Sequence, residues 1–77
     1  MTLDQVCVGQ TVEIIGMTQI NAQSLRLMEM GFVKHTPLQI IQKGFHDQII
    51  EIYIRHYFLS IRKKEAAYIL VKEIFHE

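Results

Sequence analysis

The strongest constraint on the fold is a short run of alternating isoleucines near the middle of this 77-residue chain. The alternating residues are Ile50, Ile52 and Ile54. Strict alternation predicts a β-strand that carries the isoleucines on one face. The next pair, Arg55-His56, has the length of a two-residue hairpin loop, and residues 57–61 can return as a second strand. The chain is therefore expected to fold around antiparallel strands joined by tight turns.

Weaker patterns predict the other elements of a mainly β domain. Three further strands are expected at residues 11–15, 37–42 and 68–74. Gly16 is expected to end the first of them, and short helical turns are expected at residues 2–5 and 62–67. Five short strands with one inserted helix predict a small, strongly bent antiparallel barrel, with residues 1–77 as a single domain.

The inserted helix is expected at about residues 21–30. Asn21 is a good N-cap, and Ile20 and Leu25 have the spacing of a hydrophobic staple. Leu25 and Met28 are expected to form the centre of the apolar stripe that faces the core. Leu27 and Met30 are expected to broaden this stripe. The other face of the helix carries Gln23, Arg26 and Glu29.

Gly31 has the features of a helix stop. If it occupies the C′ position in a left-handed conformation, Leu27 and Phe32 come into contact in a Schellman ending. A side chain at such a position costs on the order of 1 kcal/mol or more. The pattern therefore predicts that Phe32 and Val33 return to the core and that Gly31→Ala lowers stability.

Charge and cysteine content narrow the class of protein. Eight basic residues balance eight acidic ones, so no general attraction to nucleic acid or anionic membrane is expected. Cys7 is the single cysteine, which excludes an internal disulfide and fits a reducing compartment. Neither a signal peptide nor a run of about 20 apolar residues is present, so we expect a soluble cytoplasmic protein without direct membrane insertion.

Several segments, taken in order, resemble one protein family. RLMEMGF at residues 26–32 resembles the R-L-x-x-[LM]-G-[LFI] segment of FeoA, the small cytosolic protein of bacterial ferrous iron transport. LSIRKKEA at residues 59–66 is similar to that family's L-a-L-R-x-x-E-A segment, and the family's Ile-x-Val strand follows at residues 69–71. VGQT at residues 8–11 matches the turn into its first strand. The resemblance extends from about Leu3 to Val71.

The resemblance implies an SH3-like β-barrel and a non-enzymatic role. FeoA-like proteins are thought to act on FeoB, a membrane transporter with a cytoplasmic GTP-binding domain. This chain lacks a DNA-binding helix pair, so it resembles the free-standing form rather than the domain at the end of iron-dependent repressors. The family usually has glycine where this chain has His35 and His56, and often proline at Gln48. Both histidines are therefore expected in turns that require positive φ.

Two surfaces are candidates for binding the cytoplasmic part of FeoB and modulating its activity. The first is the helix face with Arg26 and Glu29, and the second is the basic run of Arg62, Lys63 and Lys64. Glu29 lies near the helix C-terminus, where a negative charge is mildly unfavourable, so this face can serve a purpose other than helix stability. No cofactor is expected, and pairing of edge strands between copies stays open.

Two alternatives to a protein-binding module remain open. Small barrels can bind single-stranded nucleic acid through basic and aromatic side chains. Arg55 and the basic run lie close in sequence to three aromatics: Tyr53, Tyr57 and Phe58. The zero net charge argues against this reading. Iron binding or sensing could use His35, His46, His56, His76, Asp47, Glu73 and Glu77, but their spacing matches no metal motif, which favours solvated histidines.

The glycines, the single cysteine and the methionines give no clear sign of catalysis or of phosphate binding. The four glycines are scattered, so no phosphate-binding loop is present, and no catalytic set has a sequence signature. We therefore expect no enzyme. Cys7, between two valines, is expected to be a small, partly buried core residue. Methionines 17, 28 and 30 fit either core packing or an adaptable binding surface.

Overall fold

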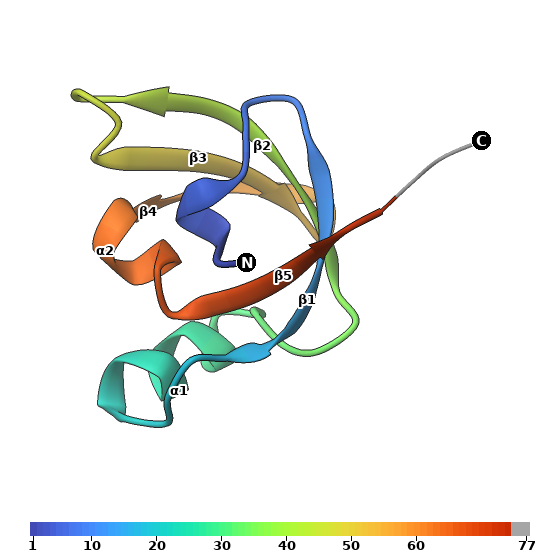
Figure 1. Ribbon diagram of the computed structural model, residues 1–77, viewed down its shortest axis with the longest axis vertical. Helices are drawn as coiled ribbons and strands as arrows, with labels where there is room; N and C mark the ends of the chain where they lie inside the picture. The colour runs from blue at the N-terminus through green and yellow to red at the C-terminus, as the bar shows by residue number, and fades with distance from the viewer. Residues whose placement is uncertain (75–77) are drawn as a thin grey trace.

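The computed structural model describes residues 1–74, which form one antiparallel sheet with short helices at its open side (Figure 1). The elements in chain order are η1 (Leu3–Gln5), β1 (Thr11–Met17), α1 (Ala22–Glu29), β2 (Pro37–Gly44), β3 (Ile49–Ile54), β4 (Tyr57–Arg62), α2 (Lys63–Ala66) and β5 (Ile69–Glu73). The strands are ordered β4-β3-β2-β1-β5, and every neighbouring pair is antiparallel. The expected mainly β fold with five strands and one inserted helix is confirmed.

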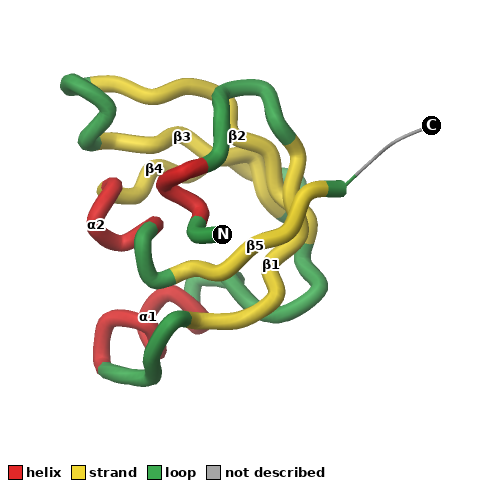
Figure 2. The backbone as a smooth tube through the Cα atoms, viewed as in Figure 1, coloured by secondary structure: helices red, strands yellow, loops and turns green. Residues whose placement is uncertain are grey.

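The sheet bends into a partly open, SH3-like barrel. Its two edge strands, β4 and β5, are connected by α2, and Figure 2 shows α2 and η1 together at the open side of the sheet. The N-terminus closes part of this opening, because Thr2 bridges Leu70 and the Val71 N–H donates to the Met1 carbonyl at 2.9 Å. The short helices therefore cover a core that two unpaired strand edges would leave open.

The alternating isoleucines form the inner face of β3. Ile50, Ile52 and Ile54 are at most 1% exposed. The rest of the core consists of Leu3, Val6, Val12, Ile14, Leu27, Phe32, Leu38, Ile40, Ile61, Ala66, Ile69 and Val71. Burial on this scale is the main stabilising contribution in a domain of this size. Cys7 is not part of this core. It is exposed between Val6 and β1, so its expected partial burial is wrong.

Two irregularities bend the strands. β1 does not end at Gly16 as expected, because the strand continues to Met17 after a register shift between Ile14 and Gly16. β2 has a similar shift between Ile40 and Gln42 where it pairs with β3. Such bulges increase the local twist and bend, which a sheet this small needs in order to wrap around its core.

The expected positive-φ turns are confirmed. His35 has φ 70°, and the hairpin pair Arg55 and His56 has φ 50° and 72°. Two successive residues with positive φ are typical of the two-residue turn that matches the twist of a hairpin. The β2–β3 turn contains three more such residues: Phe45, His46 and Asp47.

The two ends of α1 match the sequence prediction. The Asn21 side chain accepts from the Ser24 N–H at 3.0 Å, and the Ser24 hydroxyl accepts from the Asn21 N–H at 2.8 Å. At the other end, the Phe32 N–H donates to the Leu27 carbonyl and the Gly31 N–H to the Met28 carbonyl. These two bonds define the Schellman ending, and Gly31 has φ 110°.

The expected rotation of α1 about its own axis is wrong. Ser24 and Leu27 are buried, whereas Leu25 is 49% and Ile20 is 69% exposed, so neither the central Leu25–Met28 stripe nor the staple forms the buried side. Val33 is also exposed, and only Phe32 returns to the core. In a helix of eight residues, the N-cap and the Schellman reversal set the rotation, and they direct Leu27 inward.

None of the helices within residues 1–74 has both the length and the apolar character needed to cross a membrane.

Candidate protein-binding surface between the two helices

Arg26 lies on the side of α1 that faces α2. Its Nη2 atom donates to Oε2 of Glu65 at 2.5 Å, and the two side chains are 64% and 14% exposed. The sequence pattern placed Arg26 beside Glu29, one helical turn away. Within the described part of the chain, the ion pair of Arg26 is with Glu65 instead.

The junction between β4 and α2 positions the basic run. The backbone N–H of Arg62 donates to Oε1 of Glu65 at 2.9 Å, and the Lys63 N–H donates to the Gln48 carbonyl at 2.8 Å. Glu65 therefore links both candidate surfaces, because one carboxylate oxygen binds α1 and the other binds the start of α2. The spacing R-x-x-E from Arg62 to Glu65 is the local signal that could have identified this role.

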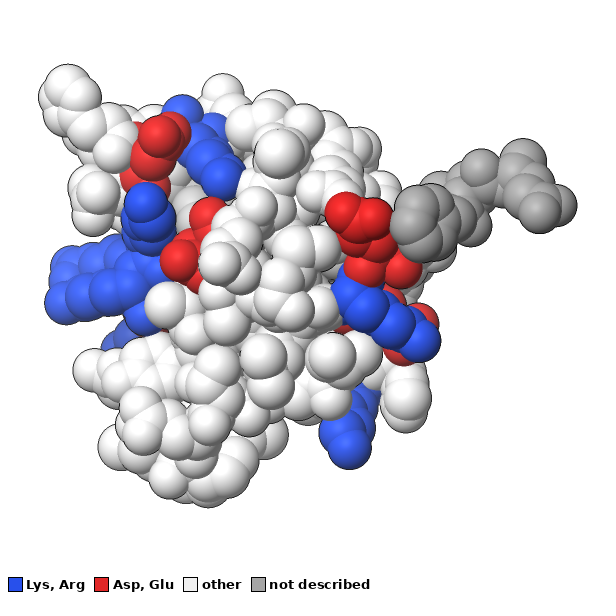
Figure 3. Space-filling view, viewed as in Figure 1, with Lys and Arg blue, Asp and Glu red and all other residues white. Residues whose placement is uncertain are grey.

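Residues from both candidate surfaces surround one hollow of about 310 Å³. Its lining consists of Gln23, Arg26, Arg62, Lys64 and Glu65. We call this site the interhelical hollow. Its lining includes Arg26, Arg62 and Lys64 from the expected set but not Glu29 or Lys63, and adds Gln23 and Glu65, which the sequence analysis missed. Three cations and one carboxylate make it basic, and Figure 3 shows Lys and Arg side chains gathered beside α2, at the left of the view.

A smaller hollow of about 240 Å³ lies on the opposite side of α1, against β1. Met17 and Met28 line it together with apolar neighbours that include Ile20 and Phe32, whereas Met30 does not. Two of the three methionines thus share a partly open apolar site.

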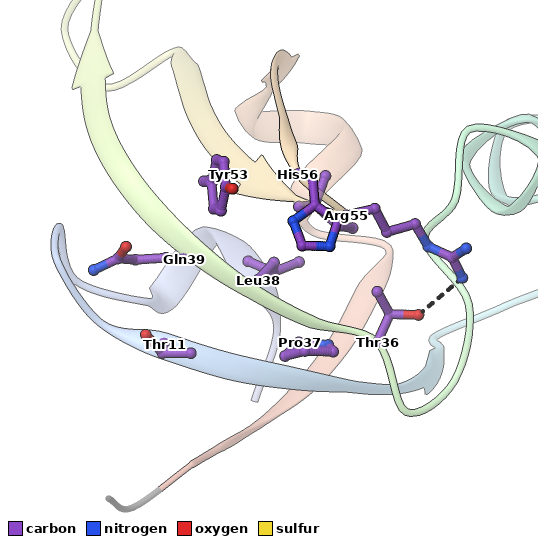
Figure 4. Close-up of a pocket in the computed structure, with 9 residues that line it drawn as sticks. Thr11, Thr36, Pro37, Leu38, Gln39, Tyr53, Arg55 and His56 are labelled. Carbon is purple, nitrogen blue, oxygen red and sulfur yellow. Dashed lines mark hydrogen bonds between the residues drawn. The ribbon is translucent and has the colours of Figure 1, made fainter.

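A third hollow, of about 430 Å³, lies over the outer side of β2 and β3 (Figure 4). Leu38 and Ile54, almost fully buried, contribute to its lining, along with Tyr53 and His56. Arg55 and Thr36 also line it, and the Thr36 hydroxyl accepts from the Arg55 guanidinium at 3.3 Å. This hollow is larger than the interhelical one, but it contains fewer charged groups able to select a ligand.

The residues that could support the two alternatives, nucleic-acid binding and iron binding, lie in several parts of the molecule. Tyr53 and Phe58 form a tilted aromatic pair on neighbouring strands, with ring centroids 4.9 Å apart. Nucleic-acid binding, which the sequence leaves as an alternative to protein binding, is not tested by this pair. Among residues 1–74, no cluster of three or more His, Cys, Asp or Glu is arranged to hold a metal ion. Of the iron-site candidates, His76 and Glu77 lie outside the described residues.

The architecture defines the class of protein. A strongly bent five-stranded antiparallel sheet, with a helix inserted after β1 and a one-turn helix before β5, is a small SH3-like domain. The chain belongs to the FeoA domain family, whose model matches residues 1–73. This family is associated with ferrous iron transport. Comparison with the curated proteins returned no match.

Solved structures of FeoA-like proteins are similar to this chain. The FeoA-like protein from Clostridium acetobutylicum is 31% identical, with a TM-score of 0.91 over 100% of this chain and 90% of that one. FeoA from Chlorobium tepidum is 25% identical, with a TM-score of 0.87 over 100% and 73% of the two chains. Stenotrophomonas maltophilia FeoA, a prokaryotic SH3 domain protein complexed with zinc, is 22% identical, with a TM-score of 0.81 over 94% and 89%.

Proposed function

We propose that this chain is a non-enzymatic, cytoplasmic accessory protein of bacterial ferrous iron uptake that binds the cytoplasmic part of the transporter FeoB. Membership of the FeoA family supports the link to iron transport. The observation that carries the proposal is the interhelical hollow, where Arg26 from α1 meets Arg62 and Lys64 from the β4–α2 junction. A concentration of basic side chains in a neutral chain fits selective binding of a complementary protein surface.

The proposed effect on FeoB is a shift in its conformational equilibrium. A bound protein can change the activity of its partner only if it binds one state more tightly than another. The GTP-bound and GDP-bound states of the cytoplasmic domain are two such states. The proposal therefore requires an affinity that depends on the nucleotide or on the transport state.

The test is a titration of the isotope-labelled chain with the soluble GTP-binding domain of FeoB, with GDP and with a GTP analogue, followed by amide chemical shifts. We expect saturable shifts confined to α1 and to residues 62–65, with different affinity in the two nucleotide states. Modest salt dependence is expected, in contrast to the steep dependence of nucleic-acid binding. Saturable shifts confined to the opposite face of the sheet would reject this surface.

Charge reversal gives a second readout. Arg26→Glu with Lys64→Glu should abolish detectable binding, because both side chains line the hollow. Lys34→Glu with Lys72→Glu changes the net charge equally and should not. Lys34 and Lys72 are exposed and lie away from the interhelical hollow, so they provide a matched control. Unchanged affinity in the Arg26 and Lys64 variant would contradict the proposed surface.

A further inference from the structure

We infer that the interhelical hollow binds an acidic segment of a protein, with carboxylates of that segment placed against Arg62 and Lys64. The identity of the protein as FeoB rests on the proposed function, but the chemistry of the ligand does not. The inference depends on three features of the hollow: which charges are already paired, how firmly they are positioned, and which hydrogen-bonding groups remain.

The first feature is an excess of positive charge. Among residues 1–74, Glu65 is the only carboxylate in the lining, and both of its oxygens accept hydrogen bonds, one from Arg26 and one from the Arg62 backbone. Within residues 1–74, the side chains of Arg62 and Lys64 form no ion pair. Two cations thus face the hollow without an internal counter-charge.

The second feature is prior positioning. The Glu65 side chain is 14% exposed. Its carboxylate holds the Arg26 side chain of α1 and also the Arg62 backbone N–H at the start of α2. The guanidinium has five N–H donors, of which Glu65 uses one, so Arg26 can still donate to a ligand. Arg26 and the backbone that carries Arg62 and Lys64 are thus ordered before binding, which lowers the entropy cost of binding relative to a site that is mobile as a whole.

The third feature is the mixed polarity of the lining, which favours a peptide over a phosphate group. The Gln23 amide can both donate and accept hydrogen bonds, and a peptide backbone offers partners for both, whereas an ionised phosphate can use only the donors. An ionised phosphate supplies acceptors and brings a larger negative charge close to Glu65. The exposed aromatic Phe58 lies four residues from Arg62 along β4, about 13 Å away, so bases stacked there would not occupy the hollow.

The first test is an amide-shift titration of the full chain at low ionic strength with three probes: hexaglutamate, hexaglutamine and inorganic phosphate. We expect saturable shifts with hexaglutamate at Gln23, Arg26 and residues 62–65, and none with hexaglutamine. Shifts of equal size around Lys34, Lys43 and Lys72 would show non-specific charge attraction and overturn the inference. Tighter binding of inorganic phosphate at the same residues would also overturn it.

Neutralising variants separate this site from general charge effects. Arg62→Gln with Lys64→Gln should weaken hexaglutamate binding about tenfold, as the loss of two charge contacts predicts. Lys34→Gln with Lys72→Gln removes the same charge elsewhere and should change the affinity less than about twofold. Equal weakening by both pairs would overturn the inference.

The same variants distinguish a failure of this inference from a failure of the proposed function. Suppose that the FeoB domain binds the Arg62 and Lys64 variant as tightly as the original chain. That result would contradict the proposed site for an acidic segment and would support FeoB as the partner. If hexaglutamate binds as expected and the FeoB domain does not bind at all, the site for an acidic segment is supported and FeoB as the partner is contradicted.

Discussion

The C-terminal end of α1 and its α2-facing flank are two parts of one short helix, but they are fixed in different ways. At the end, Leu27 and Phe32 are fully buried, and the Tyr57 hydroxyl donates to the Met30 carbonyl at 2.9 Å. On the flank, Arg26 is 64% exposed, and its ion pair with Glu65 is the contact that orders it. The end is fixed by burial and backbone hydrogen bonds, whereas the flank depends on surface charge.

Stability therefore depends mainly on the buried end of the helix, and the proposed binding site uses the exposed flank. Truncating a large buried side chain costs about 2–5 kcal/mol, whereas an exposed ion pair contributes about 0–1 kcal/mol. A helix anchored at one end can therefore carry a charged flank that is free to change without loss of the fold. Four substitutions, in order of decreasing effect, test whether the end and the flank differ in this way.

Phe32→Ala should have the largest effect. The ring is fully buried where the chain leaves the helix, so its removal should lower the free energy of unfolding by about 3–5 kcal/mol. Urea denaturation measures the loss. Val33→Ala is the neighbouring control, and because Val33 is 36% exposed, it should cost less than about 1 kcal/mol. If both variants lost a similar free energy of unfolding, burial of Phe32 would not explain how the end of the helix is anchored.

Gly31→Ala should cost about 1–3 kcal/mol, because L-residues rarely adopt its φ of 110°. An added Cβ would also lie 3.3 Å from the Tyr57 hydroxyl oxygen. Gly44→Ala is the matched control, because no atom lies within 4 Å of its added Cβ. The urea midpoint should fall in the first variant and stay nearly constant in the second. Equal midpoints would remove the conformational argument for Gly31.

Tyr57→Phe should cost about 0.5–1.5 kcal/mol through loss of the hydrogen bond to the Met30 carbonyl. Tyr53→Phe is the control, because the described structure gives the Tyr53 hydroxyl no hydrogen-bond partner. Combining Tyr57→Phe with Gly31→Ala should cost less than the sum, since removing the hydroxyl relieves the close approach of the new Cβ. Strict additivity would contradict the contact between hairpin and helix end.

Local patterns made the strands and the helix end predictable. The alternation at Ile50, Ile52 and Ile54 identifies the inner face of β3 whatever surrounds it. Gly31 followed by Phe32 predicts the Schellman ending, because its bonds join residues within one turn. Positive φ at His35 and His56 came from the family resemblance, since histidine alone does not predict it.

Features that depend on distant contacts were missed. The bulge at Gly16 depends on pairing with β5, more than 50 residues later in the chain, so the glycine resembled a strand end. The outward position of Leu25 depends on how both ends of α1 attach to the barrel. The candidate cations were named from the sequence, but their common hollow depends on the Arg26–Glu65 pair, which joins residues 39 positions apart.

Arg26→Gln should have the smallest effect on stability and is the sharpest test of the comparison. Because the Arg26–Glu65 pair lies at the surface, its loss should change the free energy of unfolding by less than about 1 kcal/mol, and the difference should shrink further in 1 M salt. Urea denaturation at low and high salt measures both effects, with Lys34→Gln as a control for the loss of one charge.

Arg26→Gln should also reduce hexaglutamate binding, because Arg26 lines the interhelical hollow. A stability loss as large as that of Gly31→Ala would show that the flank anchors the helix too. Binding and folding would then share residues, and the division between the two parts of α1 would not hold.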